Sequence, residues 1–256
     1  MEAALQVGFI TLFVVLGLVR PRAPGEGFAH ADTLVNLVTG GLLFVLRVTA
    51  ITWVAQHSQA HLVDLSPIES PLAQFAFVFL LTDFTRYWVH RAHHRFAILW
   101  TFHRVHHSSR RMNATSGLRM HVVDFLQLSA IPILYFGVVF DASTFHPGVW
   151  VALGAVVGAM DAFQHANLEV GPLRGPLKVW DKVFNNPHFH SWHHTRDIET
   201  HGDGNYGQAL TVWDRLFGTC VSHDDACREL GLSDDQDLEA GVMGLQLLQR
   251  PKTAEP

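Results

Sequence analysis

The chain has 256 residues, of which 48% are hydrophobic and only 16% are charged, and its formal net charge is −5. Soluble domains carry about 25% charged residues, so this deficit favours a membrane protein. No run of Lys or Arg indicates a nucleic-acid partner. The two cysteines, Cys220 and Cys227, fit neither a disulfide framework nor a zinc-finger spacing.

Five apolar segments predict an all-α fold, a membrane helical bundle with four or five transmembrane segments. The first segment, residues 3–19, lacks the basic residues of a cleaved signal peptide, so we interpret it as a retained helix. A helical form is expected because an unpaired strand in hydrocarbon leaves backbone groups unsatisfied. The last segment is short for a span and could form a hairpin with its neighbour, turning at residues 141–147. The other four segments cover residues 34–55, 72–89, 122–140 and 149–160.

Basic residues between these segments give a consistent orientation. Arg20 and Arg22 follow the first segment, and several arginines lie within residues 91–119, after the third segment. The loops at residues 57–70 and 141–147 contain no Lys or Arg. The positive-inside rule then places the N-terminus outside and the loop after the third segment in the cytoplasm. We expect an integral protein of a bacterial inner membrane.

The C-terminal part is more polar. Residues 1–222 are interpreted as one membrane-embedded domain, in which the region from residue 171 forms a helical cap on the cytoplasmic side. Residues 223–256 are interpreted as a polar tail. Apolar spacing predicts a short amphipathic helix over residues 236–250 of this tail. Its inward residues are Leu238, Val242, Leu245 and Leu248.

Three copies of the pattern His-x-x-His-His are the strongest signal in the chain. On a helix, positions i, i+3 and i+4 share one face, so each copy directs its imidazoles the same way. Neutral imidazole is the commonest side-chain metal ligand, and its ordinary pKa of about 6.5 predicts weaker metal binding below about pH 6. Three such clusters bordered by hydrophobic sequence predict a polynuclear metal site on the cytoplasmic side. The copies are His90/His93/His94, His103/His106/His107 and His190/His193/His194.

Further motifs accompany the triplets. A His-Ala-Asn sequence begins at His165, and an Asn-Tyr-Gly stretch at Asn205 is followed by Trp-Asp-Arg-Leu-Phe-Gly-Thr from Trp213. In order and spacing, residues 72–219 resemble the fatty acid hydroxylase/sterol desaturase superfamily. The nearest members are the bacterial sterol-desaturase-like and alkylglycerol monooxygenase-like proteins. This resemblance implies two iron ions held by histidines at the cytoplasmic face of a membrane helix bundle.

The resemblance also implies which histidines are ligands. The first histidine box of the family is His-x-x-x-His, which matches His90 and His94, so His93 is additional and its role stays open. By itself, His165 is more typical of a hydrogen-bonded core histidine, and the family motif makes it a ligand candidate. The implied set is His90, His94, His103, His106, His107, His165, His190, His193 and His194.

Carboxylates and the remaining histidines are assigned secondary roles. Asp83, Asp203 and Asp214 could accept the second N–H of a metal-bound histidine and so fix its tautomer. Asp214 could instead cap a helix or pair with Arg215. No catalytic residue beyond the metal centre is assigned. The histidines interpreted as structural or without ligand spacing are His30, His57, His61, His121, His146, His188, His201 and His223.

The chemistry depends on the metal, which spacing does not fix, because all-nitrogen sites suit zinc, iron, copper or nickel. The resemblance implies iron, O2 as cosubstrate, and hydroxylation or desaturation of a sterol, fatty acyl chain, ether lipid or carotenoid. The sequence contains no dinucleotide fingerprint, P-loop or ferredoxin cysteine cluster, so a separate ferredoxin, cytochrome or reductase is the expected electron donor. The alternative is a membrane metal-binding or transport protein without redox catalysis, which would place ionisable residues along a transmembrane path.

Aromatic residues in the third apolar segment allow two interpretations. They could line a tunnel for a lipid chain, or they could form a stripe that faces lipid or the protein core. These residues are Phe75, Phe77, Phe79, Phe84 and Trp88.

Overall fold

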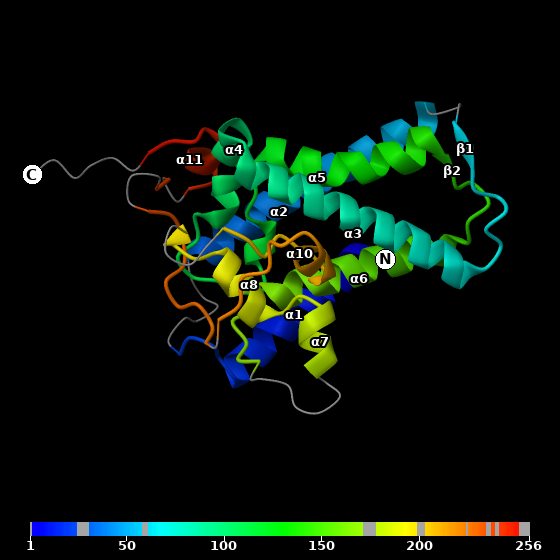
Figure 1. Ribbon diagram of the computed structural model, residues 1–256. Coiled ribbons are helices and arrows are strands. Elements are labelled where there is room, and N and C mark those ends of the chain that lie inside the picture. The colour runs from blue at the N-terminus through cyan, green and yellow to red at the C-terminus, as the bar shows by residue number, and fades with distance from the viewer. Residues whose placement is uncertain are drawn as a thin grey trace, which may run out of the picture.

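Five helices of 13 to 27 residues form a bundle (Figure 1). The computed structural model describes residues 2–24, 31–57, 61–170, 178–198, 203–223, 225–233, 237–238 and 241–250. The five predicted apolar segments correspond to these helices, except that residues 135–140 of the fourth segment lie beyond the end of its helix. The helices are α1 (Glu2–Val19), α2 (Ala31–His57), α3 (Pro71–Arg95), α5 (Val122–Leu134) and α6 (Pro147–Gln164).

Two of the helices meet the criteria for a bilayer span by length and apolar composition. These are α2, over Ala31–Val54, and α6, over Pro147–Gln164, and the helix at Ala4–Val19 is apolar but shorter. Apolar side chains on α2 are largely exposed, with 61% of Leu42 and 64% of Val45 accessible. A soluble protein rarely exposes a continuous apolar surface, so this exposure fits contact with lipid.

The fourth and fifth apolar segments differ in detail from their predicted limits. After Leu134, the chain continues as a π-helical turn, η2 (Tyr135–Val139), and enters strand β2 (Phe140–Asp141). This strand pairs in parallel with β1 (Val63–Asp64) at the end of the bundle away from the short helices (Figure 1). Helix α6 begins earlier than predicted, because the His146 Nδ1 accepts a hydrogen bond from the Gly148 amide and caps it.

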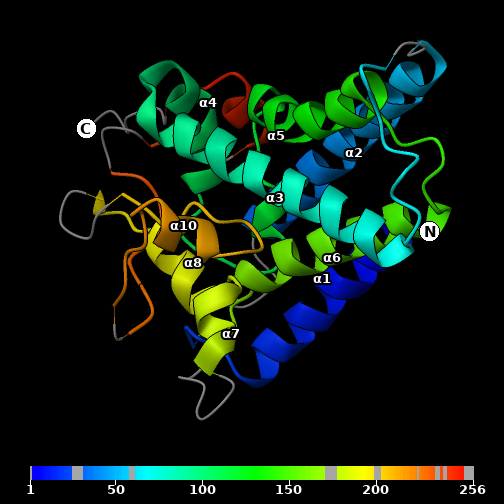
Figure 2. The ribbon, with the colours of Figure 1, turned by 45° about the vertical axis from the view of Figure 1, so that its right-hand side comes forward.

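Short helices gather at the opposite end of the bundle (Figures 1 and 2). The chain leaves α3 at Phe96, whose extended backbone separates α3 from α4 and lets the two helices pack against each other. The ends of α3 and α4, which carry the first two histidine triplets, therefore come together. The other short elements are α4 (Ala97–His107), η1 (Ser116–Leu118), α7 (Lys178–Val183), α8 (Pro187–His193), α10 (Val212–Leu216) and α11 (Val242–Gln246).

The C-terminal amphipathic helix is shorter than predicted. Instead of spanning residues 236–250, α11 covers Val242–Gln246, although residues 234–236 and 239–240 lie outside the described part. Leu248 takes a positive φ of 54°, a conformation incompatible with continuing the helix. Leu238 and Leu245 are nonetheless buried and pack with Val105, between two histidines of α4. The apolar pattern thus predicts which residues are buried more accurately than it predicts how long the helix is.

Candidate metal centre

The nine histidines implied by the resemblance come together in two groups. One nitrogen of each member lies within 4.8 Å of the corresponding nitrogens in its group. Each group takes residues from separate segments, because α3, α4 and α8 end at the same place and His165 directly follows α6. The first group is His90, His94, His103, His107 and His193, and the second is His106, His165, His190 and His194.

The two groups are adjacent. The rings of His107 and His194, one from each group, stack with their centroids 4.4 Å apart. The rings of His190 and His193, also one from each group, stack with their centroids 5.3 Å apart. Two ions held by these groups would therefore be neighbours, as in a dinuclear centre.

Backbone carbonyls fix the tautomer of several rings. A carbonyl oxygen can only accept a hydrogen bond, so the ring nitrogen that contacts it carries the proton. The opposite nitrogen, Nε2, then keeps a lone pair available for a metal. The contacts are His90 Nδ1 to Tyr206 O at 2.8 Å, His106 Nδ1 to Arg119 O at 3.1 Å, His165 Nδ1 to Asp161 O at 2.8 Å and His193 Nδ1 to Gly204 O at 2.9 Å.

Carboxylates take the same role for two further rings. The Nδ1 of His94 lies 2.9 Å from Asp203 Oδ1, and the Nδ1 of His103 lies 3.0 Å from Asp124 Oδ2. Sequence analysis proposed Asp203 but missed Asp124, which is fully buried at the start of α5. A lone acidic residue at the start of an otherwise apolar segment was the signal that could have identified it.

Within each group the Nε2 atoms lie close together and point inward, as the ligands of one shared cation would. Within the described residues, Nε2 of His94 and of His193 makes no hydrogen bond. Chains of Nε2 atoms link the other members. The distances are 3.0 Å for His90–His103, 3.2 Å for His103–His107, 3.2 Å for His106–His165, 3.0 Å for His165–His190 and 3.1 Å for His190–His194.

Protons do not readily supply that cation, because burial disfavours a charged imidazole. Burial lowers the pKa of His103 to about 4. It also lowers, well below the ordinary range, the pKa values of His106, His107, His190, His193 and His194. Neutral imidazoles with converging lone pairs are the donor set that a divalent transition metal requires, so the residues fit a pair of such ions.

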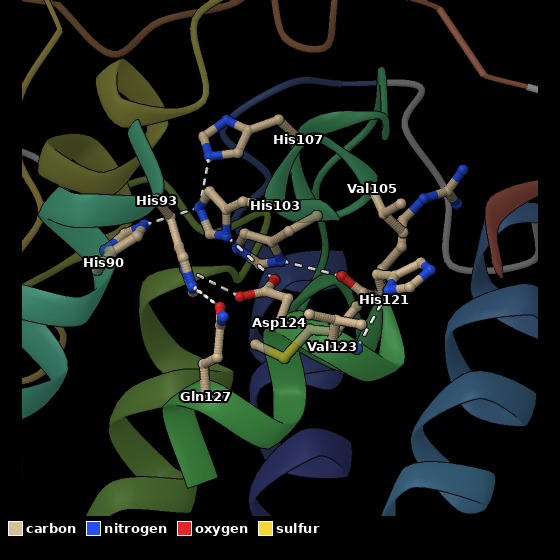
Figure 3. A network of polar contacts seen from close by, with 12 residues as sticks. His90, His93, His103, Val105, His107, His121, Val123, Asp124 and Gln127 are labelled. Carbon is tan, nitrogen blue, oxygen red and sulfur yellow. Dashed lines mark hydrogen bonds and ion pairs between the residues drawn. The ribbon is translucent and has the colours of Figure 1, made fainter. Parts of the chain in front are cut away.

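His93, whose role the sequence left open, belongs to neither of these two groups but lies with His103 and Asp124 in a third set of side chains able to hold an ion (Figure 3). Its Nε2 lies 2.5 Å from Gln127 Oε1, and its Nδ1 lies 3.1 Å from Asp124 Oδ1. The ring stacks against His103 at 5.0 Å. His93 therefore contacts the carboxylate that supports a group member.

Asp83 and Asp214 accept hydrogen bonds from the segment of residues 206–219, which includes α10, rather than from histidines. Asp83 accepts from the amides of Ala209 and Leu210 and from Trp213 Nε1. Asp214 accepts from the amides of Tyr206 and Gly207 and from Thr219 Oγ1, all at 2.8 Å. Burial raises the pKa of Asp214 to about 6. Asp214 thus holds the backbone at Tyr206, whose carbonyl contacts the His90 Nδ1.

Several histidines interpreted as structural have other contacts. The Nε2 of His188 lies 2.9 Å from the His223 carbonyl, and the Nε2 of His121 lies 2.9 Å from the Gln246 carbonyl. His223 itself stacks on Trp192. His61 lies near Asp141, in the loop that carries β1. His30, His201 and the side chain of His57 lie outside the described residues.

A cavity of about 620 Å³ borders the second group. It lies between α2, α3, α5 and α6, and Gly117 is part of its wall. A methyl group added to Gly117 would lie 3.0 Å from the Nδ1 of His165, so the cavity ends next to the histidines. The aromatic residues proposed for a tunnel pack elsewhere: Phe75 stacks on Phe79, and Phe84 contacts Trp213.

Fold and site together define a mostly helical protein with two candidate membrane spans and a histidine-rich site able to hold metal. Residues 75–219 match the family model described as fatty acid hydroxylase. The chain therefore belongs to the fatty acid hydroxylase family. No solved structure gives a significant match.

Named relatives in this family act on different lipids. The chain is 32% identical over 208 residues to the ornithine lipid hydroxylase OlsE of Rhizobium tropici, covering 77% of this chain and 58% of that protein. It is 30% identical over 217 residues to the alkylglycerol monooxygenase of Homo sapiens, covering 83% and 45%. It is 30% identical over 147 residues to the Delta(7)-sterol 5(6)-desaturase ERG3A of Gibberella zeae, covering 57% and 37%. The chain thus spans about half the length of the curated relatives it matches.

Proposed function

We propose that this chain is an O2-dependent di-iron oxidoreductase that hydroxylates or desaturates an unactivated C–H bond of a membrane lipid. The observation that carries this proposal is the pair of adjacent, buried imidazole groups with lone pairs facing inward. The relatives support the lipid as substrate, since their names specify an ornithine lipid, an alkylglycerol and a sterol.

The two groups of histidines are the proposed iron ligands. His90, His94, His103, His107 and His193 would hold one ion, and His106, His165, His190 and His194 the other. Bound reduced iron would supply O2 activation, which an aliphatic C–H bond needs because it has no acidic proton. For six of these histidines the protein holds the Nδ1 proton on a carbonyl or carboxylate, which leaves the Nε2 lone pair free for the metal. They are His90, His94, His103, His106, His165 and His193.

An electron donor is a necessary part of this proposal. Hydroxylation places one oxygen atom in the C–H bond and reduces the other to water, which consumes two electrons and two protons. The sequence has no nicotinamide, flavin or iron–sulfur motif. A separate ferredoxin, cytochrome or reductase is therefore the proposed partner, docking near the histidine end.

The proposed arrangement is a bundle of four or five membrane helices with the histidines on the cytoplasmic side. Helices α1, α3 and α6 end near the histidines, whereas α2 and α5 begin there. Arg20, Arg91 and Arg95 lie at that end, in agreement with the positive-inside rule. Residues 1–222 would form the membrane-embedded domain, capped by its short C-terminal helices, and residues 223–256 the polar tail.

Metal content and oxygen consumption of purified protein test the proposal together. We expect two irons per chain, one for each group, and O2 consumption that requires both lipid and an electron donor. His106→Ala and His193→Ala each remove one member of a group and should lose iron and activity. His61→Ala, an exposed histidine far from the groups, is the matched control.

Two results would reject the proposal. Activity retained in His106→Ala or His193→Ala would show that these groups do not hold the reactive metal. Stable iron binding without lipid-dependent O2 consumption would favour the alternative, a membrane metal-binding or transport protein. Product analysis by mass spectrometry then separates the two reaction types, since hydroxylation adds one oxygen and desaturation removes two hydrogens.

A further inference from the structure

The cavity beside the histidines has two chemically different ends. Its volume of about 620 Å³ lies within the range of about 300–1,000 Å³ typical of pockets for small organic ligands. Away from the histidines it is lined by apolar side chains, among them Val54, Phe136 and Trp150. Near the histidines its wall includes Arg86 and Asp161. Such a gradient suits an amphiphile whose headgroup lies at the histidine end.

Arg86 connects this cavity to the first histidine group. It precedes His90 by four residues on α3, which corresponds to about 6 Å along the helix. Its guanidinium donates a hydrogen bond to Gln208 Oε1 at 3.1 Å. The amide nitrogen of Gln208 lies 2.9 Å from the Nδ1 of His90. A ligand that contacts Arg86 is therefore close to the proposed metal ligands.

Asp161 lies beside the second histidine group, as Arg86 lies beside the first. It precedes His165 by four residues, and its backbone carbonyl accepts the hydrogen bond from the His165 Nδ1. Its carboxylate also borders Gly117 in the cavity wall. Trp150 lies eleven residues earlier on α6, about 16 Å away along the helix. The distance between the histidine end and the apolar end of the cavity is thus about the length of a lipid alkyl chain.

Charged side chains from three helices line the cavity. Arg47 of α2 also lines the wall, and Asp161, Asp83 and Arg47 are the charged groups that act on Arg86. Asp83 is turned toward the amides of Ala209 and Leu210, so it belongs to that loop. Two guanidiniums and one carboxylate therefore face the cavity. Ionisable residues at such a depth are costly and usually mark a ligand path.

We propose that the cavity binds an amphiphile with an anionic headgroup, a carboxylate or a phosphate, that pairs with Arg86 and Arg47. Its alkyl chain extends toward Trp150, so the carbons next to the headgroup lie nearest the histidines. Arginine suits this task because its planar fork binds both kinds of oxyanion. That this amphiphile is the substrate rests on the proposed function.

Quenching of Trp150 fluorescence by bromine tests both binding and orientation. The probes are dodecanoates brominated at the terminal or the α-carbon, terminally brominated dodecyl phosphate, and the neutral, terminally brominated dodecanol. The quenching is the difference between the protein and its Trp150→Phe variant, measured in neutral detergent. We expect saturable quenching by the terminally brominated anions and little quenching by the α-brominated isomer. The carboxylate and phosphate probes show which oxyanion is preferred.

Charge variants separate the headgroup from the chain. Arg86→Gln and Arg47→Gln should each weaken binding of the anionic probes about tenfold or more, the size expected for a charged hydrogen bond, and leave the alcohol unchanged. Arg86→Lys should retain most of the affinity. Asp161→Asn removes a negative charge from the cavity wall and should therefore tighten anion binding. Arg95→Gln, exposed at the end of the same helix, is the matched control.

Several outcomes would overturn the inference. Equal binding of anion and alcohol, or anion binding unchanged in both arginine variants, would show that the headgroup is not recognised by charge. Stronger quenching by the α-brominated isomer would show the reverse orientation. Because these measurements need neither metal nor turnover, inactive protein that binds as expected would reject the proposed oxidation alone.

Discussion

Asp124 contacts His103 through one carboxylate oxygen, with 3.0 Å between Oδ2 and the ring Nδ1. Its other oxygen lies 3.1 Å from the Nδ1 of His93, which is outside both histidine groups. The carboxylate is fully buried, so neither contact is weakened by water. One acidic residue at the start of α5 therefore determines how a ring on α4 faces the proposed metal.

Replacing Asp124 with Asn tests this orientation. The Asn oxygen can accept a hydrogen bond from only one of the two rings, and the Asn NH2 group then faces the Nδ1 of the other ring. Where the NH2 group faces His103, that ring no longer has an acceptor that keeps the proton on Nδ1. Removing such a partner of a ligand histidine typically lowers metal affinity about 10–100-fold. Competition with a chelator measures the affinity, and Asp225→Asn, at an exposed position, is the control. Unchanged affinity would show that the contact is structural only.

The buried imidazoles predict a pH-dependent stability of the metal-free protein. Burial lowers the pKa of His103 from about 6.5 to about 4, so between these values the unfolded chain binds more protons than the folded chain. Stability is then fully present above about pH 6.5 and falls as the pH drops toward 4, by roughly 3 kcal/mol for this residue. Below about pH 4 this contribution should level off.

Thermal unfolding of the chelator-treated protein in detergent measures this dependence. His103→Gln removes one such group and should give a shallower slope, provided that the variant folds at pH 7. A melting temperature that stays constant between pH 6.5 and pH 4 would contradict the buried, neutral state of these rings. The unperturbed pKa alone would place the loss of metal near pH 6, so retention of metal below that value is also expected.

Gly117 allows close packing between η1 and the second histidine group. A Cβ at this position would clash with the Asp161 carboxylate and lie 3.0 Å from the His165 Nδ1. Gly117→Ala should therefore displace His165, at a cost of about 1–3 kcal/mol, and lower iron content toward one per chain. Gly41→Ala on α2 is the control, because no atom of a neighbouring residue lies within 4 Å of the added Cβ, and it should retain both irons. Elemental analysis distinguishes these outcomes.

Gln246 joins the C-terminal helix to the backbone beside the metal centre. Its Oε1 accepts from the Val122 amide at 3.0 Å, and its Nε2 donates to the Met120 carbonyl at 2.8 Å. Gln246→Ala leaves both backbone groups without this partner, which should destabilise the protein by about 1–3 kcal/mol. The variant should melt earlier than Gln249→Ala, an exposed control. Equal melting temperatures would show that the contact contributes little.

The sequence predicted the histidines better than their partners. The family resemblance implied nine ligand histidines, and the structure brings these nine rings into two groups. Partners such as the carbonyls of Arg119 and Gly204 could not be predicted, because every residue has a carbonyl and only tertiary contacts select one. Asp124 was missed for a related reason: it lies 21 residues from His103 in a different helix.

Long apolar segments in a charge-poor sequence predicted the mostly helical fold, because a backbone placed in hydrocarbon must satisfy its hydrogen bonds internally. Spacing within each triplet determined which rings share a helix face. Only the tertiary structure decided which triplet members pair across helices, that His93 stays outside, and that two arginines face the cavity. These relations depend on how separate helices end and pack, a long-range property that no local pattern encodes.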